Sequence, residues 1–358
     1  MKQIRTVDAV GTVLCHDITQ IIKGVTKDAV FRKGHVVTEE DIPVLLSVGK
    51  EWLYVWEKEE GMLHENDAAE ILCSMCRGDH MERSEAKEGK IELTAACDGL
   101  FKADNEALKA VNGFGQMMIA TRHGNFAVKA GDKLAGTRII PLVIEEEKME
   151  AARKQAMEIT GGRPILTLLP FVHKKVGIVT TGNEVYSGRI QDTFTPVILE
   201  KFAEFDTEIV GHVTLNDDDK RVTAAILDLI GKGADVVVCT GGMSVDPDDK
   251  TPLAIRNTGS RIVSYGAPVL PGAMFLLAYY EKERRGGSPA VVMGLPGCVM
   301  YAKRTIFDLV LPRVMADDPV TAQELAALGQ GGLCLNCPVC TFPNCGFGKG
   351  ILHGIYTF

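Results

Sequence analysis

The second half of the chain constrains the fold most strongly, because short apolar runs alternate there with stretches of helical periodicity. The apolar runs lie at 175–180, 208–213, 235–239, 261–265, 274–280 and 290–293, and helices are expected at 193–205, 221–231 and near 298–314. Strands that are apolar on both faces and alternate with helices are typical of a mostly parallel sheet covered on both sides. We therefore predict a three-layer α/β/α domain over residues 172–316.

The rest of the chain divides into three predicted parts. Residues 1–150 hold strand candidates at 10–14, 29–31 and 52–55 and a helix candidate near 63–76, so we expect a mixed, strand-rich region of one or two subdomains. Residues 151–171 complete a charged helix that starts near Glu145 and then connect to the α/β domain. Residues 317–358 are predicted to be a linker followed by a Cys-rich tail.

Composition and charge exclude several classes of protein. The formal net charge is −8, and the Lys and Arg residues form no cluster that would drive nucleic-acid binding. No apolar run reaches the roughly 18 residues of a membrane span, and the first residues lack the apolar stretch of a signal peptide. We therefore expect a cytoplasmic protein that binds neither nucleic acid nor membrane.

Three glycine-containing loops follow predicted strands, at 180–184, 240–251 and 294–297. The ligand crevice of an open parallel sheet lies beyond the carboxyl ends of its strands, so we expect these loops on one rim. Glycine permits close backbone approach, and its exposed N–H groups can bind an anion. The G-x-G-x-x-G fingerprint and the phosphate loop ending in Gly-Lys-Ser/Thr are both absent, so a different nucleotide-like ligand is predicted.

The loop sequences resemble the molybdopterin-binding domain shared by the MoeA, gephyrin and MogA proteins. Thr-Thr-Gly-Asn-Glu, Thr-Gly-Gly-Met-Ser-Val and Gly-Leu-Pro-Gly carry the resemblance, in that order, within residues 172–316. In that family the Gly-Gly loop ends in an acid closely followed by Thr, which here are Asp249 and Thr251, and Glu184 matches the acid of the first motif. The resemblance implies that Glu184 and Asp249 are catalytic and that Mg²⁺ could bridge carboxylate and phosphate oxygens.

The resemblance also implies a wider set of ligand-binding residues. They are Thr180, Thr181, Gly182, Asp192, Thr240, Gly241, Gly242, Ser244, Thr251, Pro271, Gly272, Gly294, Pro296 and Gly297. The ligand would be molybdopterin or its adenylylated form.

Four departures from the family pattern bear on activity. Asn183 stands where an Asp is usual, and Phe194 where an Asn is usual. The family's Lys-Pro-Gly-Lys-Pro is Leu270-Pro-Gly-Ala-Met274, and its Gly-Leu-Pro-Gly continues here as Cys298-Val299 instead of Asn-Pro. Each lost lysine contact is worth about 1.5–3 kcal/mol. We therefore expect ligand binding more firmly than insertion of molybdenum.

Three functions remain open from the sequence. The first is a molybdotransferase-like role in making or transferring the molybdenum cofactor, with a molybdoenzyme or biosynthetic protein as partner and a homodimer as the expected assembly. The second is a nucleotide pyrophosphatase, because residues 240–249 also resemble the loop of CinA proteins and Asp248-Asp249 suit a metal-activated water. The third is a non-catalytic molybdopterin carrier or sensor.

Four cysteines lie close together in the tail, in the pattern Cys334-x₂-Cys337-x₂-Cys340-x₄-Cys345. The pattern is close to cluster-binding C-x₂-C-x₂-C runs and is compatible with tetrahedral zinc. We therefore predict that these four residues bind Zn²⁺ or a 4Fe–4S cluster, which the spacing alone does not distinguish. Another pair, Cys73 and Cys76, shares one face of a predicted helix, and we expect both side chains to be buried.

Overall fold

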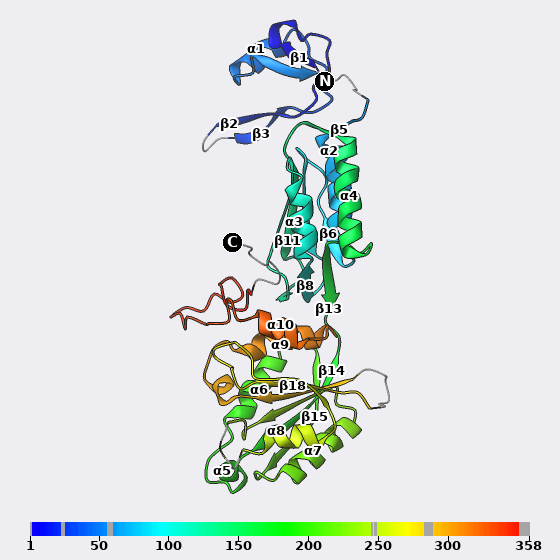
Figure 1. Ribbon diagram of the computed structural model, residues 1–358. Helices are drawn as coiled ribbons and strands as arrows, with labels where there is room; N and C mark the ends of the chain where they lie inside the picture. Colours follow the sequence, from blue (N-terminus) through cyan, green and yellow to red (C-terminus); the bar gives the residue numbers. More distant parts are fainter. Residues whose placement is uncertain are drawn as a thin grey trace. The chain divides into compact units, whose positions relative to one another are not determined.

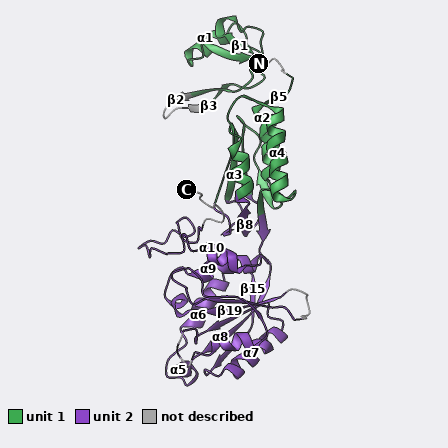
Figure 2. Cartoon of the chain, in the orientation of Figure 1, with its two compact units in different colours: residues 1–94, 106–122, 133–167 green, residues 95–105, 123–132, 168–358 purple. Residues whose placement is uncertain are grey.

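The structure divides into two compact units. It is a computed structural model that describes residues 2–22, 26–55, 60–244, 246, 249–282 and 289–350. Unit 1 comprises residues 1–94, 106–122 and 133–167, and unit 2 comprises residues 95–105, 123–132 and 168–358 (Figure 2). Two short segments from the first 150 residues therefore belong to unit 2. In the described part of the chain, no helix is long and apolar enough to cross a membrane.

In its described residues, unit 1 contains short strands, most of them paired antiparallel, and four helices. The strands are β1 (Lys2–Arg5), β2 (Ile18–Ile22), β3 (Thr26–Phe31), β4 (Trp52–Val55), β5 (Met62–His64), β6 (Met81–Arg83), β7 (Lys90–Ala95), β9 (Met117–Thr121), β11 (Lys133–Ile139) and β12 (Val143–Glu145). The helices are α1 (Asp41–Ser47), α2 (Glu65–Cys76), α3 (Asn105–Gly113) and α4 (Glu146–Thr160), and a 3₁₀ turn η1 spans Thr6–Asp8. The largest sheet has the order β6-β7-β11-β9.

The strand-rich character expected of the N-terminal region is confirmed. The candidates at 29–31 and 52–55 fall in β3 and β4, whereas residues 10–14 contribute only isolated bridges. Cys73 and Cys76 are buried in α2, as expected. A compact antiparallel region therefore precedes the α/β domain in sequence.

Unit 2 contains the predicted α/β domain and a small accessory sheet. Its main strands are β14 (Lys174–Thr181), β15 (Thr207–Leu215), β16 (Val236–Thr240), β17 (Arg261–Tyr265), β18 (Leu276–Tyr280) and β19 (Ala290–Leu295), in the order β15-β14-β16-β19-β18-β17. Figure 1 shows β14, β15 and β18 of this sheet. The first four in that order are mutually parallel, while β18 and β17 complete the sheet as antiparallel strands. The accessory sheet consists of β8 (Gly99–Ala103), β10 (Phe126–Val128) and β13 (Leu166–Pro170).

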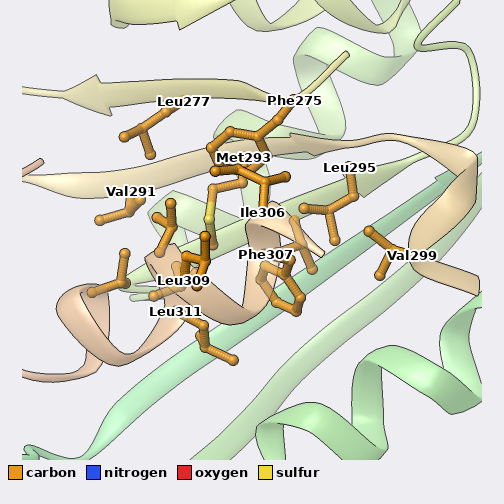
Figure 3. Packing of buried hydrophobic residues seen from close by; sticks show 14 of the residues in the cluster. Phe275, Leu277, Val291, Met293, Leu295, Val299, Ile306, Phe307, Leu309 and Leu311 are labelled. Carbon is orange, nitrogen blue, oxygen red and sulfur yellow. The ribbon is translucent and has the colours of Figure 1, made fainter. Parts of the chain in front are cut away.

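Helices cover both faces of the main sheet, which confirms the three-layer prediction. They are α5 (Asn183–Tyr186), α6 (Phe194–Phe202), α7 (Asp219–Gly231), α8 (Thr251–Asn257), α9 (Ile306–Met315) and α10 (Ala322–Ala327), with a 3₁₀ turn η2 at Gly297–Met300. Buried residues of α6, α9 and α10 pack with one face, and those of α7 and α8 with the other. Figure 3 shows Met293 and Leu295 of β19 near Ile306 and Phe307 of α9.

Two glycines inside strands make room for helix α7. A Cβ atom added at Gly177 of β14 would lie 2.9 Å from the nearest atom of the Leu229 side chain, and one added at Gly211 of β15 would lie 2.7 Å from it. The Leu229 side chain is fully buried, and burying a leucine contributes about 1.5–3 kcal/mol. The missing side chains of two neighbouring strands therefore let α7 pack closely on the sheet.

The closing helix begins later than the sequence pattern suggested. The expectation of a helix near 298–314 is wrong in its first part, because residues 297–300 form the 3₁₀ turn η2 and α9 starts at Ile306. A capping box sets this start: the Thr305 side chain accepts from the Phe307 N–H, and Asp308 Oδ2 accepts from the Thr305 N–H at 2.7 Å. The Thr-x-x-Asp pattern thus marks the N-terminus of this helix.

Asp308 also joins α9 to α6 through a buried ion pair. Its Oδ1 atom accepts from Lys201 Nζ at 2.6 Å and from Arg304 Nη1 at 2.9 Å. The side chains of Asp308 and Lys201 are only 4% and 11% exposed, so their charges depend on each other for stabilisation.

We predict that Asp308→Ala lowers the free energy of unfolding by about 3–5 kcal/mol, because it leaves Lys201 buried without its counter-charge and removes a helix cap. Chemical denaturation followed by circular dichroism measures the loss. A matched control is Asp228→Ala, which breaks the exposed ion pair with Lys232 and should cost less than about 1 kcal/mol. Equal losses in the two variants would contradict this role of Asp308.

Candidate functional site

The parallel register places the predicted loops at one edge of the sheet. Thr180 of β14 pairs with Thr240 of β16, which in turn pairs with Leu295 of β19, so the three strands end level with one another. The chain leaves β14 for β15 on one side and then crosses to β16 on the other. The carboxyl edge between β14 and β16 is therefore a topological switch point, where open α/β sheets bind their ligands.

The loops after β14 and β16 are in direct contact. Gly241 has φ +84°, and a Cβ atom there would lie 2.2 Å from the Thr181 carbonyl oxygen. Gly242 has φ +56°, and its Cβ atom would lie 2.9 Å from Thr251 Oγ1. The Thr251 hydroxyl donates to the Gly241 carbonyl at 2.9 Å and lies 3.2 Å from Thr181 Oγ1. Both glycines are thus required for the close approach of the two loops.

A second group of polar side chains surrounds the end of β14. Asp192 Oδ1 accepts from the backbone N–H groups of Phe194 and Thr195, and its Oδ2 accepts from the Thr195 hydroxyl at 2.5 Å. His212 Nε2 of β15 lies 3.0 Å from Thr180 Oγ1. Burial opposes ionisation of Asp192, but these hydrogen bonds and the nearby His212 outweigh it and hold the pKa of Asp192 below its ordinary value. The carboxylate is therefore an ionised anchor beside Thr180.

Three carboxylates gather at the same edge. Asp217, in the loop after β15, accepts from the Asn183 N–H at 3.0 Å. Burial, with the negative charges of Glu184 and Asp249, raises the pKa of Asp217. The same Asp249 charge adds to burial in raising the pKa of Tyr265, whose hydroxyl donates to the Met243 carbonyl at 3.2 Å. The predicted acids Glu184 and Asp249 thus share one electrostatic environment.

The remaining predicted loops border this edge from the β18–β19 side. Gly294 pairs with Leu276, the first residue of β18, and a Cβ atom at Gly294 would lie 2.5 Å from Met243 Sδ. Pro296 is buried and Gly297, which begins η2, is exposed. Gly272, with φ +126°, packs against Ile306 of α9. The loop that lacks the family's two lysines, 270–274, therefore leads directly into the edge of the sheet.

Some predicted site residues differ in exposure from the rest. Thr180, Thr181, Thr240 and Thr251 are buried, whereas Glu184 and Ser244 are exposed. Asp248, which the pyrophosphatase alternative invoked, lies outside the described residues.

Within the described ranges, no three Cys, His, Asp or Glu side chains are arranged so that together they could hold one metal ion. The catalytic, Mg²⁺-binding and cysteine-ligand assignments therefore stay predictions.

Sequence reasoning missed three polar residues of this edge: Asp217, His212 and Tyr265. Asp217 follows β15, and its proximity to Glu184 arises from the pairing of β14 with β15. Tyr265 ends the last strand of the sheet and reaches Met243 across the intervening strands. The one available signal was position, since all three lie at or near the end of a predicted strand or loop at the carboxyl edge.

Family models match two segments of the chain. Residues 177–316 match a model described as a probable molybdopterin binding domain, and residues 3–57 match a domain of unknown function. The first segment holds every loop of the site described above, and the second lies wholly within unit 1.

Curated relatives match over a short segment. A CinA-like protein of Mycolicibacterium vanbaalenii is 37% identical over 78 residues, which cover 22% of this chain and 18% of that protein. A CinA-like protein of Mycobacterium tuberculosis is 35% identical over 94 residues, which cover 26% of this chain and 22% of that protein. The chain thus spans about a fifth of the length of these relatives.

Solved structures resemble part of the chain. The tungsten cofactor synthesizing protein MoaB of Pyrococcus furiosus is 25% identical, with a TM-score of 0.30, and the match covers 36% of this chain and 84% of that one. CinA of Thermoplasma acidophilum is 18% identical, with a TM-score of 0.32, and the match covers 40% and 98%. The likeness to the probable molybdopterin-binding domain family thus lies in residues 177–316, which are less than half of the chain.

Proposed function

We propose that unit 2 binds molybdopterin or its adenylylated form at the carboxyl edge of β14, β16 and β19, and that the protein acts in biosynthesis or transfer of the molybdenum cofactor. The observation that carries the proposal is the match of residues 177–316 to the probable molybdopterin-binding family. The level strand ends and the glycines at 241 and 242 support it, since they bring the loops after β14 and β16 together at a switch point.

Mg²⁺ fits the proposed site as a partner of the ligand's phosphate. Mg²⁺ usually binds one or two carboxylates together with phosphate oxygens and water, so it does not need three protein ligands. Glu184 and Asp249 are the candidates, with Asp217 close enough for its pKa to respond to both charges. The ion would neutralise the negative charge of the phosphate, while the protein's residues bind and orient the ligand.

The same carboxylates support a second candidate function. The matched relatives are named CinA-like proteins, and a nucleotide pyrophosphatase would use these acids to position a divalent cation and water. A third candidate, a carrier or sensor without turnover, is favoured by Leu270 and Ala273, which stand where the MoeA family has lysines. Ligand preference and turnover separate the three candidates. We also predict that the protein binds a partner protein of the cofactor pathway and forms a homodimer.

For the binding site, we predict that Asp249→Asn weakens Mg²⁺-dependent binding of adenylylated molybdopterin by about tenfold, because one charge-assisted contact is worth about 1.5 kcal/mol. Calorimetry with molybdopterin, its adenylylated form and simple nucleotides, with and without Mg²⁺ and molybdate, measures the effect. Asp246→Asn, an exposed acid of the same loop, is the control and should bind normally. Failure of the unaltered protein to bind any pterin form would overturn the proposed function, and release of mononucleotide from a dinucleotide would favour the pyrophosphatase.

For the pH dependence, we predict that Mg²⁺-dependent binding declines as the pH falls through the raised pKa of Asp217, because the protonated acid no longer attracts the cation. The decline should therefore begin at a higher pH than an ordinary aspartate would give. In Asp217→Asn, binding should be weaker at neutral pH, and this early decline should be absent. Calorimetry across a pH series tests it, and an unchanged profile in the variant argues against Asp217.

For the missing lysines, we predict that the double variant Leu270→Lys, Ala273→Lys binds adenylylated molybdopterin at least about tenfold more tightly, since it restores cationic contacts worth about 1.5–3 kcal/mol each. Leu270 is 55% exposed and makes its hydrogen bonds to Gly332 and Cys334 through its backbone, so the change is compatible with the fold. Leu270→Gln, Ala273→Gln is the uncharged control. Equal affinity in both double variants would show that this loop does not face the anionic part of the ligand.

A further inference from the structure

The four cysteines of the tail line a single cavity in unit 2. Cys334, Cys337, Cys340 and Cys345 border a space of about 440 Å³, and all four are free thiols. Cys337 and Cys340 are exposed, while the other two are partly buried and pack against the main hydrophobic core. The fold therefore brings together four soft ligands that the sequence spaces over twelve residues.

The tail is held against the α/β domain on both sides of the cavity. Leu270 N–H donates to the Gly332 carbonyl and Cys334 N–H donates to the Leu270 carbonyl, both at 2.8 Å, forming a short parallel bridge. Phe347, at the other end, is only 4% exposed and belongs to the core of unit 2. Lys303 Nζ donates to the Pro338 carbonyl at 3.0 Å. The cysteine loop is therefore anchored at its start, middle and end.

The wall of the cavity is suited to a negatively charged occupant. Lys303 and Arg304 line it, and among its described lining residues there is no Asp or Glu. The Arg304 guanidinium lies 5.0 Å from the ring centre of Phe342, and Arg304 also pairs with Asp308. Lys303 and the Asp308-paired Arg304 would therefore add positive charge beside four metal-bound thiolates.

The size of the cavity favours a cluster over a single ion. A zinc ion binds its four sulfurs at about 2.3 Å from one centre and needs no open space between them, whereas a 4Fe–4S core binds each thiolate through a different iron and needs room among the cysteines. All four cysteines border the same space of about 440 Å³, and in the part of the chain that the structure describes no three of them are placed to hold one metal ion. The C-x₂-C-x₂-C run is also the cluster-binding pattern.

We propose that Cys334, Cys337, Cys340 and Cys345 bind a 4Fe–4S cluster in this cavity, beside Arg304 and Lys303. Pro271, which belongs to the loop predicted to contact the pterin, also lines the cavity, so the cluster would adjoin the proposed ligand site. The proposal does not depend on the identity of that ligand, because cluster binding is measured directly by the iron and sulfide content of the protein.

The test uses the full chain, purified without oxygen and reconstituted with ferrous iron and sulfide. We expect about four iron and four acid-labile sulfide per chain, with visible absorption that dithionite bleaches. In Cys337→Ala, Cys340→Ala both contents should fall by at least half, while Cys97→Ala, which changes a cysteine of unit 2 outside the cavity, should retain them. Circular dichroism checks that the variants are folded.

Two results would overturn the proposal. One is a chain that takes up zinc at one ion per molecule and, after reconstitution, holds no sulfide. The other is a folded double variant that keeps the iron and sulfide of the unaltered protein. If the double variant does not fold, the iron and sulfide content of the unaltered protein and of Cys97→Ala still decides between a cluster and its absence. Pterin binding is measured separately, so a failed cluster test leaves the proposed function standing.

Discussion

The parallel pairing of β14 with β16, and of β16 with β19, is the constraint on which the rest of the site depends. Because the hydrogen-bonded register makes Thr180, Thr240 and Leu295 neighbours, the loops that follow them must leave the sheet at the same edge. Gly241 then allows the loop after β16 to contact the Thr181 carbonyl. A shift of one strand would turn its buried residues to the opposite face and separate the loops.

The electrostatics of this edge are unusual for a site that would hold an anionic ligand. Glu184, Asp217 and Asp249 add negative charge, and the loop at 270–274 carries no lysine to offset it. In the proposed function a divalent cation would neutralise both the carboxylates and a phosphate. On the other side of the same loop, Leu270 anchors the cysteine tail, so one segment joins the two candidate sites.

Much of the α/β domain could be predicted because its strands and loops have local signals. The run Arg261–Tyr265 is a strand with the predicted bounds, and the three-layer architecture follows from apolar strands separated by helices. The start of α9 could not be read from hydrophobic periodicity, since the apolar pattern continues through η2. The Thr305 capping box and its contact with Asp308 decide it. Asp217 and Tyr265 were missed because they join the site only through strand order.

The sequence by itself determined the class of fold, the three glycine loops and the four clustered cysteines, because periodicity and spacing are local properties of the chain. Tertiary structure decided which distant residues meet. It interleaves the two units along the chain, makes room for Leu229 through Gly177 and Gly211 on neighbouring strands, and places Arg304 beside the cysteine loop. These contacts depend on register, helix packing and the return of the tail onto the core, which involve residues far apart in sequence and leave no local pattern.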